Sequence, residues 1–393
     1  MIAITGGRVY TGTAGFIPAG TVLIDGGRIA AVGKGIAVPD DAKVYRADGK
    51  YVMPGLIDAH SHLGLFGEPS VPATADGNET TDPITPHIRG IDSINPGDPA
   101  FPEVLAAGVT TVYTGPGSAN IVGGTGVAIK LRGRTADEMV IPGSEGMKMA
   151  LGENPKRVYG ETKKQAPSTR MGNAALLRNA LVHAANYLNN LERAQEEPAD
   201  GKRPKLPDRD LKWEALGRVL KREWKARIHA HRADDILTAI RIAEEFGLDY
   251  VIEHATEGYK IADLLAAKGV PCTVGPLLMT RSKMELEHVT LKNPGILARA
   301  GVKLAIQVDG ASSTKWLALH AGLAVREGMP EEEALRAITS NAAEILGLSA
   351  RIGSLEPGKD ADIAVFSGHP FETLSVCKLV LIDGEVCYER EVG

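Results

Sequence analysis

Two pairs of histidines, each with a single residue between its members, are the side chains best suited to do chemistry. His60 and His62 follow the apolar run 53–57, and His229 and His231 lie in a second strand-like run. Residues two apart on a β-strand point to the same face, so both imidazoles of a pair can donate a nitrogen to one metal ion. The spacing therefore predicts metal ligands at the ends of two strands.

Two further polar residues end apolar runs in the same way. His254 closes the run 250–254, and Asp309 closes the run 304–309. Five of the ten histidines and one aspartate then fall at strand ends, where six buried polar groups would each need a partner. Metal binding supplies that partner, so we expect all six residues to bind metal, with Asp309 and His254 also taking part in catalysis.

The fourth predicted strand, which ends near Leu151, offers two competing ligands. Lys148 can react with carbon dioxide to form a carbamate that bridges two metal ions, whereas Glu153 supplies a carboxylate directly. Five positions separate the two residues, so they point to opposite faces if the strand is regular. We expect only one of them to contact metal, and either can instead form an ion pair.

Three further residues are candidates for contacting a substrate. His87 and Arg170 lie in segments expected to be mobile loops, where a solvated surface role competes with substrate binding. Tyr113 lies at the end of the second predicted strand. The glycine-rich segment 115–126 matches neither GxGxxG nor GxxxxGK[ST], so we interpret it as a loop and not as a phosphate site.

The candidate ligands need a scaffold that brings strand ends together. From about residue 53 to 346, short β-branched runs alternate with helical patterns, which indicates βα units and a parallel sheet. The candidate strands end near His62, Thr114, Leu131, Leu151, His231, His254, Val274 and Asp309. Eight such units predict a (β/α)8 barrel, which places catalytic groups at the carboxyl ends of its strands.

Both chain ends are predicted to form β structure. The runs at 22–32 and 380–386 each contain an Asp-Gly pair, which favours a hairpin because a type I′ turn needs positive φ at both central positions. An isolated hairpin is marginal in water, so we expect residues 1–53 and 347–393 to pack together as one small β-sandwich. The predicted fold is α/β, a TIM-like (β/α)8 barrel over 54–346 with a β-sandwich made by both termini.

Two segments of the predicted barrel stand out. Residues 152–224 form a long insertion, expected to contain a helix at 173–197 and then a flexible polar link at 197–204. Long loops at this face of a barrel often shape the substrate pocket. The clearest helix is predicted from 330 to 346, with acidic residues in its first turn and Gly347 after its end.

Composition narrows the class of protein further. The 393 residues carry 44 basic and 49 acidic side chains, a net charge of −5, without a like-charge block suited to nucleic acid. No apolar run reaches the roughly 18 residues of a membrane helix, and the N-terminus does not resemble a signal peptide. We expect a cytoplasmic protein that acts on a small molecule, without nucleic-acid or membrane partners, and that can form a homo-oligomer. Its three cysteines, Cys272, Cys377 and Cys387, are expected to be reduced.

These motifs resemble the metal-dependent amidohydrolase superfamily. The resemblance rests on the opening hairpins and on the segments 54–62, 107–112 and 353–363, and it covers nearly the whole chain. Within the superfamily the chain looks most like the imidazolonepropionase-like and prolidase-like members. The resemblance implies a TIM-like barrel flanked by a β-sandwich from both termini.

The resemblance also implies roles for particular residues. It assigns metal binding to His60, His62, one histidine of strand five, His254 and Asp309, with Asp309 also relaying protons. His229 matches the strand-five position better than His231, and the doubled motif leaves both open. Similarity to prolidase-like members makes Lys148 the carbamate candidate, yet the Gly-Glu-Asn-Pro at 152–155 departs from their glycine pair and keeps Glu153 as an alternative bridge.

The expected reaction is hydrolysis of a carbon–nitrogen bond by water that one or two divalent ions activate, while Asp309 moves the proton to the leaving nitrogen. Zinc is the first choice of metal, and iron, manganese and nickel also suit these ligands. A cyclic amide is the first expected substrate, and a dipeptide or N-acyl amino acid is the second. Deamination with a single metal ion is a third possibility. The alternative from another class is a catalytically silent metal-binding scaffold.

Overall fold

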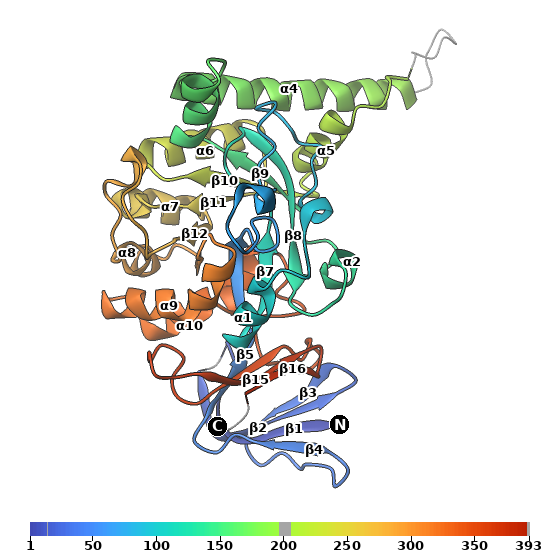
Figure 1. The fold of residues 1–393 in the computed structure, drawn as a ribbon, viewed down its shortest axis with the longest axis vertical. Helices are drawn as coiled ribbons and strands as arrows, with labels where there is room; N and C mark the ends of the chain where they lie inside the picture. Colours follow the sequence, from blue (N-terminus) through green and yellow to red (C-terminus); the bar gives the residue numbers. More distant parts are fainter. Residues whose placement is uncertain (14, 196–205, 391–393) are drawn as a thin grey trace.

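A computed structural model describes residues 1–13, 15–195 and 206–390. Figure 1 shows a barrel of strands surrounded by helices and, below it, a smaller sheet in which the first strands (blue) and the last strands (red) of the chain lie together. The predicted fold class, a TIM-like barrel with a β domain formed by both termini, is confirmed.

The barrel has a strand at each predicted position. Its strands are β6 (Leu56–Ser61), β7 (Val109–Thr114), β8 (Val122–Lys130), β9 (Gly146–Ala150), β10 (Lys225–Ala230), β11 (Tyr250–His254), β12 (Cys272–Val274) and β13 (Leu304–Ile306). They pair in this order, and β13 lies against β6, so the sheet nearly closes. The last strand ends at Ile306, three residues before the predicted end at Asp309.

The prediction of a wholly parallel sheet is wrong at β8, which runs antiparallel to both β7 and β9. Residues 115–121 join β7 to β8, and a parallel connection would need a dozen or more residues. The loop predicted over 115–126 is therefore wrong in its second half, because β8 begins at Val122. Glycine permits the close packing here: a Cβ on Gly126 would lie 2.7 Å from the carbonyl oxygen of Thr114.

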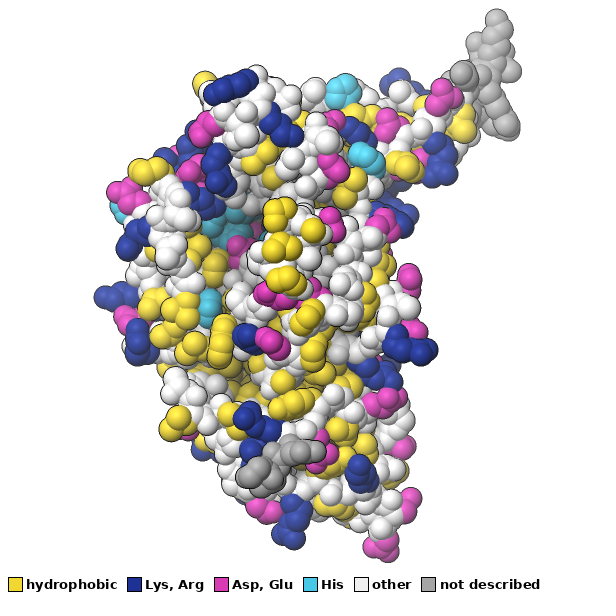
Figure 2. Space-filling view, in the orientation of Figure 1, with side chains coloured by type: hydrophobic (Ala, Val, Ile, Leu, Met, Phe, Trp, Pro, Cys, Tyr) yellow, Lys and Arg dark blue, Asp and Glu magenta, His cyan; other side chains and the backbone are white. Residues whose placement is uncertain are grey.

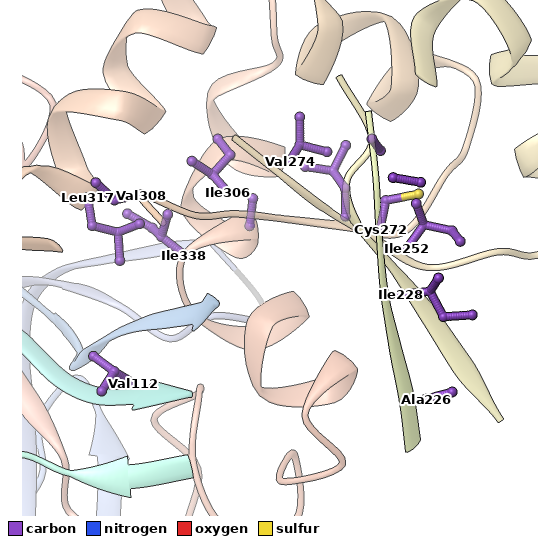
Figure 3. Packing of buried hydrophobic residues seen from close by; sticks show 14 of the residues in the cluster. Val112, Ala226, Ile228, Ile252, Cys272, Val274, Ile306, Val308, Leu317 and Ile338 are labelled. Atoms are coloured by element: carbon purple, nitrogen blue, oxygen red, sulfur yellow. The ribbon is translucent and has the colours of Figure 1, made fainter. Parts of the chain in front are cut away.

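Alternation along the barrel strands separates an apolar outer layer from a polar interior. Ile228 and Ile252 belong to the cluster of buried apolar side chains in Figure 3, which joins neighbouring strands and helices. The next residues, His229 and Glu253, point to the opposite face and are also buried. Packing of the outer layer thus directs the chemically active side chains into the barrel.

Helices cover the outside of the barrel (Figure 1). They are α1 (Ala100–Ala106), α2 (Ala136–Met139), α3 (Glu153–Lys156), α4 (Arg170–Gln195), α5 (Leu211–Leu220), α6 (Ala233–Glu245), α7 (Ala262–Lys268), α8 (Asn293–Arg299), α9 (Leu317–Arg326), α10 (Glu331–Ala337) and α11 (Ser340–Ile345). Within α6, the buried face includes Ile236, Ala239, Ile240 and Ala243, which recur at helical spacing.

The insertion between β9 and β10 contains α3, a π-helical turn at Arg157–Thr162, α4 and α5. The helix predicted over 173–197 is α4, which crosses the end of the barrel farthest from the smaller sheet (Figure 1). The side chain of Asn173 donates a hydrogen bond to the carbonyl oxygen of Gly152 at 2.8 Å and ties α4 to the end of β9. The polar link predicted at 197–204 lies outside the described residues.

The single helix predicted from 330 to 346 is wrong, because it is divided into α10 and α11. Its start after Pro330 and the following Gly347, with φ of 74°, agree with the prediction. The break occurs where the carbonyl oxygen of Ile338 accepts a hydrogen bond from the N–H of Ile57 in β6 at 2.9 Å. The helix thus gives up part of its own hydrogen bonding to anchor the first barrel strand.

The smaller sheet combines strands from both ends of the chain. Its members are β1 (Ile2–Tyr10), β2 (Phe16–Asp25), β3 (Arg28–Gly33), β4 (Lys43–Arg46), β5 (Tyr51–Pro54), β14 (Ile363–Phe366), β15 (Cys377–Ile382) and β16 (Glu385–Glu389). Both predicted hairpins are present, and their central residues, Gly26 with Gly27 and Asp383 with Gly384, all have positive φ. The sheet encloses a core of its own that draws apolar side chains from both ends of the chain.

Two absences within the described ranges complete the fold. No helix there is both long enough and apolar enough to cross a membrane. The three cysteines form no disulfide: Cys272 and Cys377 are buried, and Cys387 is partly buried.

Candidate metal centre

Two of the predicted ligands lie at the carboxyl end of β6: His60 is in the strand and His62 directly follows it. Asp58 accepts hydrogen bonds from the backbone N–H of His60 at 3.1 Å and of Val308 at 3.2 Å, which ties the end of β6 to the end of β13. The Nδ1 of His62 lies 2.7 Å from the carbonyl oxygen of Gly115. We assign the proton of His62 to Nδ1, so its Nε2 presents a lone pair.

Asp309 joins these two imidazoles. Its Oδ1 lies 3.1 Å from Nε2 of His60 and 3.2 Å from Nε2 of His62. The backbone φ of Asp309 is 60°, a left-handed conformation that the surrounding contacts must hold in place. Burial alone would raise the pKa of Asp309, but the imidazoles of His254, His60 and His62 outweigh burial and keep the pKa well below its usual value. The carboxylate is therefore ionised at neutral pH.

A second group of imidazoles lies where β10 and β11 end. The rings of His229, His231 and His254 have centroids 4.4 to 4.6 Å apart. Nδ1 of His231 is 2.7 Å from Oγ1 of Thr256, and Nδ1 of His254 is 2.8 Å from the carbonyl oxygen of Gly275. Among the described residues, neither ring nitrogen of His229 has a hydrogen-bond partner. Burial lowers the pKa of all three imidazoles, that of His254 to about 3, so they are neutral and can act as ligands.

A buried carboxylate supports His60 from behind. Glu253 has its Oε2 2.9 Å from Nδ1 of His60 and its Oε1 2.6 Å from the Arg227 guanidinium. The guanidinium in turn lies 3.8 Å from the centroid of the Tyr113 ring. Burial would raise the pKa of Glu253, but Arg227 and His60 lower it below its usual value. The carboxylate can therefore hold a proton on Nδ1 of His60 and leave Nε2 directed at Asp309.

Of the two fourth-strand candidates, Lys148 is the one beside the histidines. It is buried in β9, and its Nζ lies 3.5 Å from Nε2 of His60. Burial lowers the pKa of Lys148 to about 8. Far more of this amine is unprotonated at neutral pH than in an exposed lysine.

Glu153 is directed toward a different residue, Glu285. The N–H of Glu153 donates to Oε2 of Glu285 at 2.9 Å, and Oε2 of Glu153 accepts from the N–H of Glu285 at 3.1 Å. The other oxygen of Glu285, Oε1, lies 3.6 Å from Nε2 of His231 and 3.8 Å from Nε2 of His229. Nζ of Lys283 is 2.5 Å from the same oxygen and 3.2 Å from Nε2 of His231. Glu153 thus holds Glu285, and Glu285 is the carboxylate that approaches the imidazoles.

Three polar residues near the imidazoles were not predicted from the sequence: Glu253, Glu285 and Lys283. Glu253 precedes a predicted ligand on a strand, where adjacent side chains normally point to opposite faces. Glu285 and Lys283 lie between β12 and α8, where the structure has one short 3-10 turn at Met284–Leu286. No apolar periodicity marks this segment, so the sequence offered no signal for either residue.

The three residues predicted to contact substrate lie in different surroundings. Tyr113 is buried beside the metal ligands, and its hydroxyl donates to the carbonyl oxygen of Gly146 at 3.0 Å. Arg170 opens α4 and places Nε 3.0 Å from each carboxylate oxygen of Asp235. His87 is exposed on the long connection after β6.

The histidines lie recessed in a hollow of the barrel (Figure 2). A cavity of about 10 Å³ beside them is lined by His60, Ser61, His62, Tyr113, Gly115, Pro116, Lys148 and Arg227. This volume is about that of one water-sized sphere. A larger pocket of about 320 Å³ is lined in part by His87, Arg89 and Pro116. Pro116 lines both spaces.

The donor set fits a divalent ion. Two ligands on a tetrahedral ion with bonds of about 2.1 Å lie about 3.4 Å apart, and Asp309 Oδ1 is 3.1 and 3.2 Å from the imidazoles of His60 and His62. Burial lowers the pKa of His62, so its Nε2 has no proton to donate to Asp309. Nε2 of His62 and Oδ1 of Asp309 are then two acceptors that face each other at this distance, and a cation between them would satisfy both.

The comparisons with known proteins place this site in a family. The model of the Amidohydrolase family matches residues 51–387, so the chain belongs to that family. The family and the similarity to imidazolonepropionases indicate a hydrolase that acts on carbon–nitrogen bonds. The TIM-like barrel and the cluster of histidines and aspartate at its mouth agree with this assignment.

Three known proteins define the likeness more closely. The amidohydrolase from Thermotoga maritima MSB8 has a TM-score of 0.94 and 47% identity, covering 99% of this chain and 100% of that structure. Amidohydrolase tasK of Hapsidospora irregularis is 30% identical over 396 residues; the match covers 95% of this chain and 40% of that longer protein. The imidazolonepropionase of Maricaulis maris (strain MCS10) is 28% identical over 375 residues, which cover 90% of this chain and 88% of that protein.

Proposed function

We propose that this enzyme hydrolyses a cyclic amide, or another small amide, with the help of a divalent ion held by His60, His62 and Asp309. The observation that carries the proposal is the convergence of two imidazole nitrogens on one carboxylate oxygen, at 3.1 and 3.2 Å. The similarity to imidazolonepropionase supports a cyclic substrate. Zinc is the first choice of ion, and iron, manganese and nickel suit the same donors.

The residues of this chain can carry out the proton transfers of such a reaction. When bound, the ion would polarise the carbonyl group and lower the pKa of water from about 16 to about 7. Asp309 is ionised and can take the water proton on Oδ2, because its Oδ1 faces the imidazoles. It then donates this proton to the leaving nitrogen as the carbon–nitrogen bond breaks and the water oxygen bonds to the carbonyl carbon.

Lys148 is proposed as the ligand contributed by the fourth strand, in the form of a carbamate. Carbon dioxide reacts with the unprotonated amine, which the lowered pKa of about 8 makes available. The carbamate would place a negative charge beside His60, whose Nε2 lies 3.5 Å from Nζ of the lysine. Glu153 is less suited to this role because its Oε2 is held by the N–H of Glu285.

A substrate panel with matched metal analysis tests the proposal. Purified enzyme reconstituted with zinc is assayed on cyclic amides, on dipeptides and N-acyl amino acids, and on amino-substituted rings that would release ammonia. We expect the highest kcat/KM on a cyclic amide and no turnover after chelation. A preference for dipeptides, acylated amino acids or deamination would replace the proposed substrate class. Full metal occupancy without turnover of any compound would indicate a silent scaffold.

Metal content identifies the fourth-strand ligand. Inductively coupled plasma mass spectrometry on wild-type, Lys148→Ala and Glu153→Ala protein, each purified without a chelating tag, counts the ions per chain. We expect Lys148→Ala to lose metal and Glu153→Ala to retain the wild-type content. The reverse pattern would exchange the two roles, and equal content in all three proteins would contradict a bridging carbamate.

A further inference from the structure

A small cavity inside the barrel is bordered by two buried basic side chains from neighbouring strands. Lys148 in β9 and Arg227 in β10 are paired positions of these parallel strands, so their side chains leave the sheet side by side on the same face. Both line the cavity of about 10 Å³, which is about the volume of one water-sized sphere. We name this space the Lys148–Arg227 cavity. It has room for a single oxygen atom.

We infer that the Lys148–Arg227 cavity holds one oxygen of the Lys148 carbamate, and that Arg227 is the positioning residue that donates a hydrogen bond to this oxygen. The inference rests on the proposed function, in which Lys148 carries a carbamate. It extends that function by naming the group that stabilises the modification. Arg227 is a cation without a lone pair to offer, so this role is separate from metal binding.

The guanidinium of Arg227 has one donor without an acceptor. Its Nη2 is 2.6 Å from Oε1 of Glu253 and donates to the carbonyl oxygen of Ala59 at 2.5 Å. Its Nε has no hydrogen-bond partner among the described residues, although the side chain is only 2% exposed. A buried N–H without an acceptor is costly, and a guanidinium cannot lose its proton to avoid that cost. An acceptor in the adjoining cavity would remove this cost.

Other contacts fix the position of the guanidinium. Its Cζ lies 3.8 Å from the centroid of the Tyr113 ring, which is a cation–π contact. The Tyr113 hydroxyl is held in turn by its hydrogen bond to the carbonyl oxygen of Gly146 at 3.0 Å. Gly146 makes room for the arginine, because a Cβ at that position would lie 2.8 Å from Cδ of Arg227. The donor is therefore in place before an acceptor forms.

Formation of the carbamate supplies the missing acceptor. The lone pair of Lys148 Nζ attacks the carbon of carbon dioxide, so a nitrogen–carbon bond forms, one carbon–oxygen π bond becomes a lone pair on oxygen, and Nζ loses one proton to water. A neutral amine thus becomes an anion with two acceptor oxygens. Nζ lies 3.5 Å from Nε2 of His60, so one oxygen can face the metal ligands while the other enters the cavity. A hydrogen bond between a guanidinium and an anion is about twice as strong as one between neutral groups.

The test measures carbamate formation by ¹³C NMR. Protein freed of carbon dioxide is titrated with ¹³C-labelled bicarbonate at fixed pH and fixed zinc concentration, and Lys148→Ala identifies the carbamate resonance by its absence. Arg227→Lys keeps the positive charge beside Glu253 but removes the planar Nε–H donor. The matched control is Arg232→Lys, since Arg232 is a partly exposed arginine just after β10 that pairs with Asp234 at 2.8 Å.

We expect Arg227→Lys to need at least tenfold more bicarbonate than wild type for half-formation of the carbamate, whereas Arg232→Lys should behave as wild type. Zinc content, measured by mass spectrometry on the same samples, should fall in Arg227→Lys at ambient carbon dioxide and return to the wild-type level at saturating bicarbonate. If circular dichroism shows Arg227→Lys to be misfolded, Arg227→Gln, whose amide keeps a neutral donor, replaces it.

Two results would overturn the inference. An unchanged bicarbonate requirement in Arg227→Lys would leave only a water molecule as the partner of Nε. A loss of zinc that bicarbonate does not restore in a folded variant would show that Arg227 acts through packing and not through the carbamate.

The titration separates this inference from the proposed function. It requires no turnover, so the expected variant pattern can stand even if no amide is hydrolysed. Hydrolysis by an enzyme whose carbamate forms independently of Arg227 would leave the proposed function intact and remove only the role of Arg227. Absence of the carbamate resonance from every protein would contradict both this inference and the carbamate on Lys148, while the substrate panel would still decide the hydrolysis.

Discussion

Two clusters of polar side chains in this molecule compensate in different ways for the hydration that their buried members have lost. We call the first the boundary cluster: Lys130, Asp360, Asp362 and Asp383, with Arg28 and Arg351 at its edge. It lies where β8 meets the smaller sheet, and Nζ of Lys130 is 2.8, 3.0 and 2.5 Å from Asp360, Asp362 and Asp383. Asp360 is also 2.6 Å from Arg28 and 2.9 Å from Arg351. Every acid there has a base.

The cluster at the barrel mouth is only partly paired: Glu253 contacts Arg227 and His60, and Glu285 contacts Lys283. There, the imidazoles of His60 and His62 face the Asp309 carboxylate at 3.1 and 3.2 Å, and neither ring nitrogen of His229 has a hydrogen-bond partner within the described residues. Both clusters contain buried ionisable side chains, such as Asp360 and His60, so burial alone does not mark a functional site. The distinguishing feature is whether the protein's own groups complete the arrangement. The boundary cluster is complete and joins two parts of the fold, whereas a cation from solution would complete the mouth cluster.

The largest expected effect comes from breaking the mouth cluster at Asp309. Asp309→Asn keeps the size of the side chain but removes its capacity to accept and pass on a proton. We expect kcat on the best substrate to fall by about 10² to 10⁴, with the metal content reduced by less than half. Steady-state kinetics and mass spectrometry check this, with urea unfolding as the control for stability. Retention of near wild-type kcat with metal bound would show that Asp309 is not the proton carrier.

Breaking the boundary cluster should cost stability and not activity. Lys130→Met leaves three acidic side chains without their shared cation, and we expect the free energy of unfolding to fall by about 3 to 5 kcal/mol. Lys148→Met is the matched substitution in the mouth cluster. Because burial already lowers the pKa of Lys148 to about 8, we expect a change below about 1 kcal/mol in metal-free protein. Urea unfolding measures the free energy of unfolding of both variants. Equal losses would show that the two clusters do not differ in their contribution to stability.

The positions of several mouth-cluster histidines could be predicted because these residues follow strand alternation. His60 and His62 share one face at the end of β6, and His229 follows the same rule on β10. His254 does not: its φ of 71° breaks the alternation, so Glu253 and His254 both reach the neighbourhood of His60. The position of Glu253 behind His60 could not be predicted from the sequence, because it depends on the local backbone conformation at His254.

The parts of the fold that escaped prediction are set by contacts distant in sequence. The antiparallel direction of β8 follows from the short connection 115–121, but a glycine-rich strand lacks the side chains by which strands are recognised. The break between α10 and α11 occurs where the N–H of Ile57 donates a hydrogen bond to the carbonyl oxygen of Ile338. Glu285 reaches the imidazoles because Glu153, 132 positions away in sequence, holds it. None of these pairings leaves a periodic signal.

A smaller effect is expected from the support of His60. Glu253→Gln keeps a hydrogen-bond acceptor near Nδ1 of His60 but removes the negative charge that orients this imidazole. We expect the first metal ion to bind about 10- to 100-fold more weakly, with kcat at saturating metal reduced less than in Asp309→Asn. Competition with a chromophoric chelator measures the affinity. Thr273→Val removes another contact of Glu253 while preserving its charge, and an equal loss in that variant would attribute the effect to packing.

The smallest effect concerns the pH dependence of the boundary cluster, where one carboxyl group keeps a raised pKa although it is paired. Burial raises the pKa of Asp362 from 3.8 to about 6, despite the lowering effect of Lys130. A raised pKa means that the folded protein takes up a proton as the pH falls through 6, before the unfolded chain does. Stability from this group therefore rises as the pH falls from 8 to 5, by about 1 kcal/mol. Asp362→Asn should lack this gain, so the difference in unfolding free energy between wild type and variant should shift by that amount between the two pH values. A difference that stays constant would show that Asp362 is ionised throughout this pH range. The lowering effect of Lys130 on the pKa of Asp362 would then outweigh the raising effect of burial.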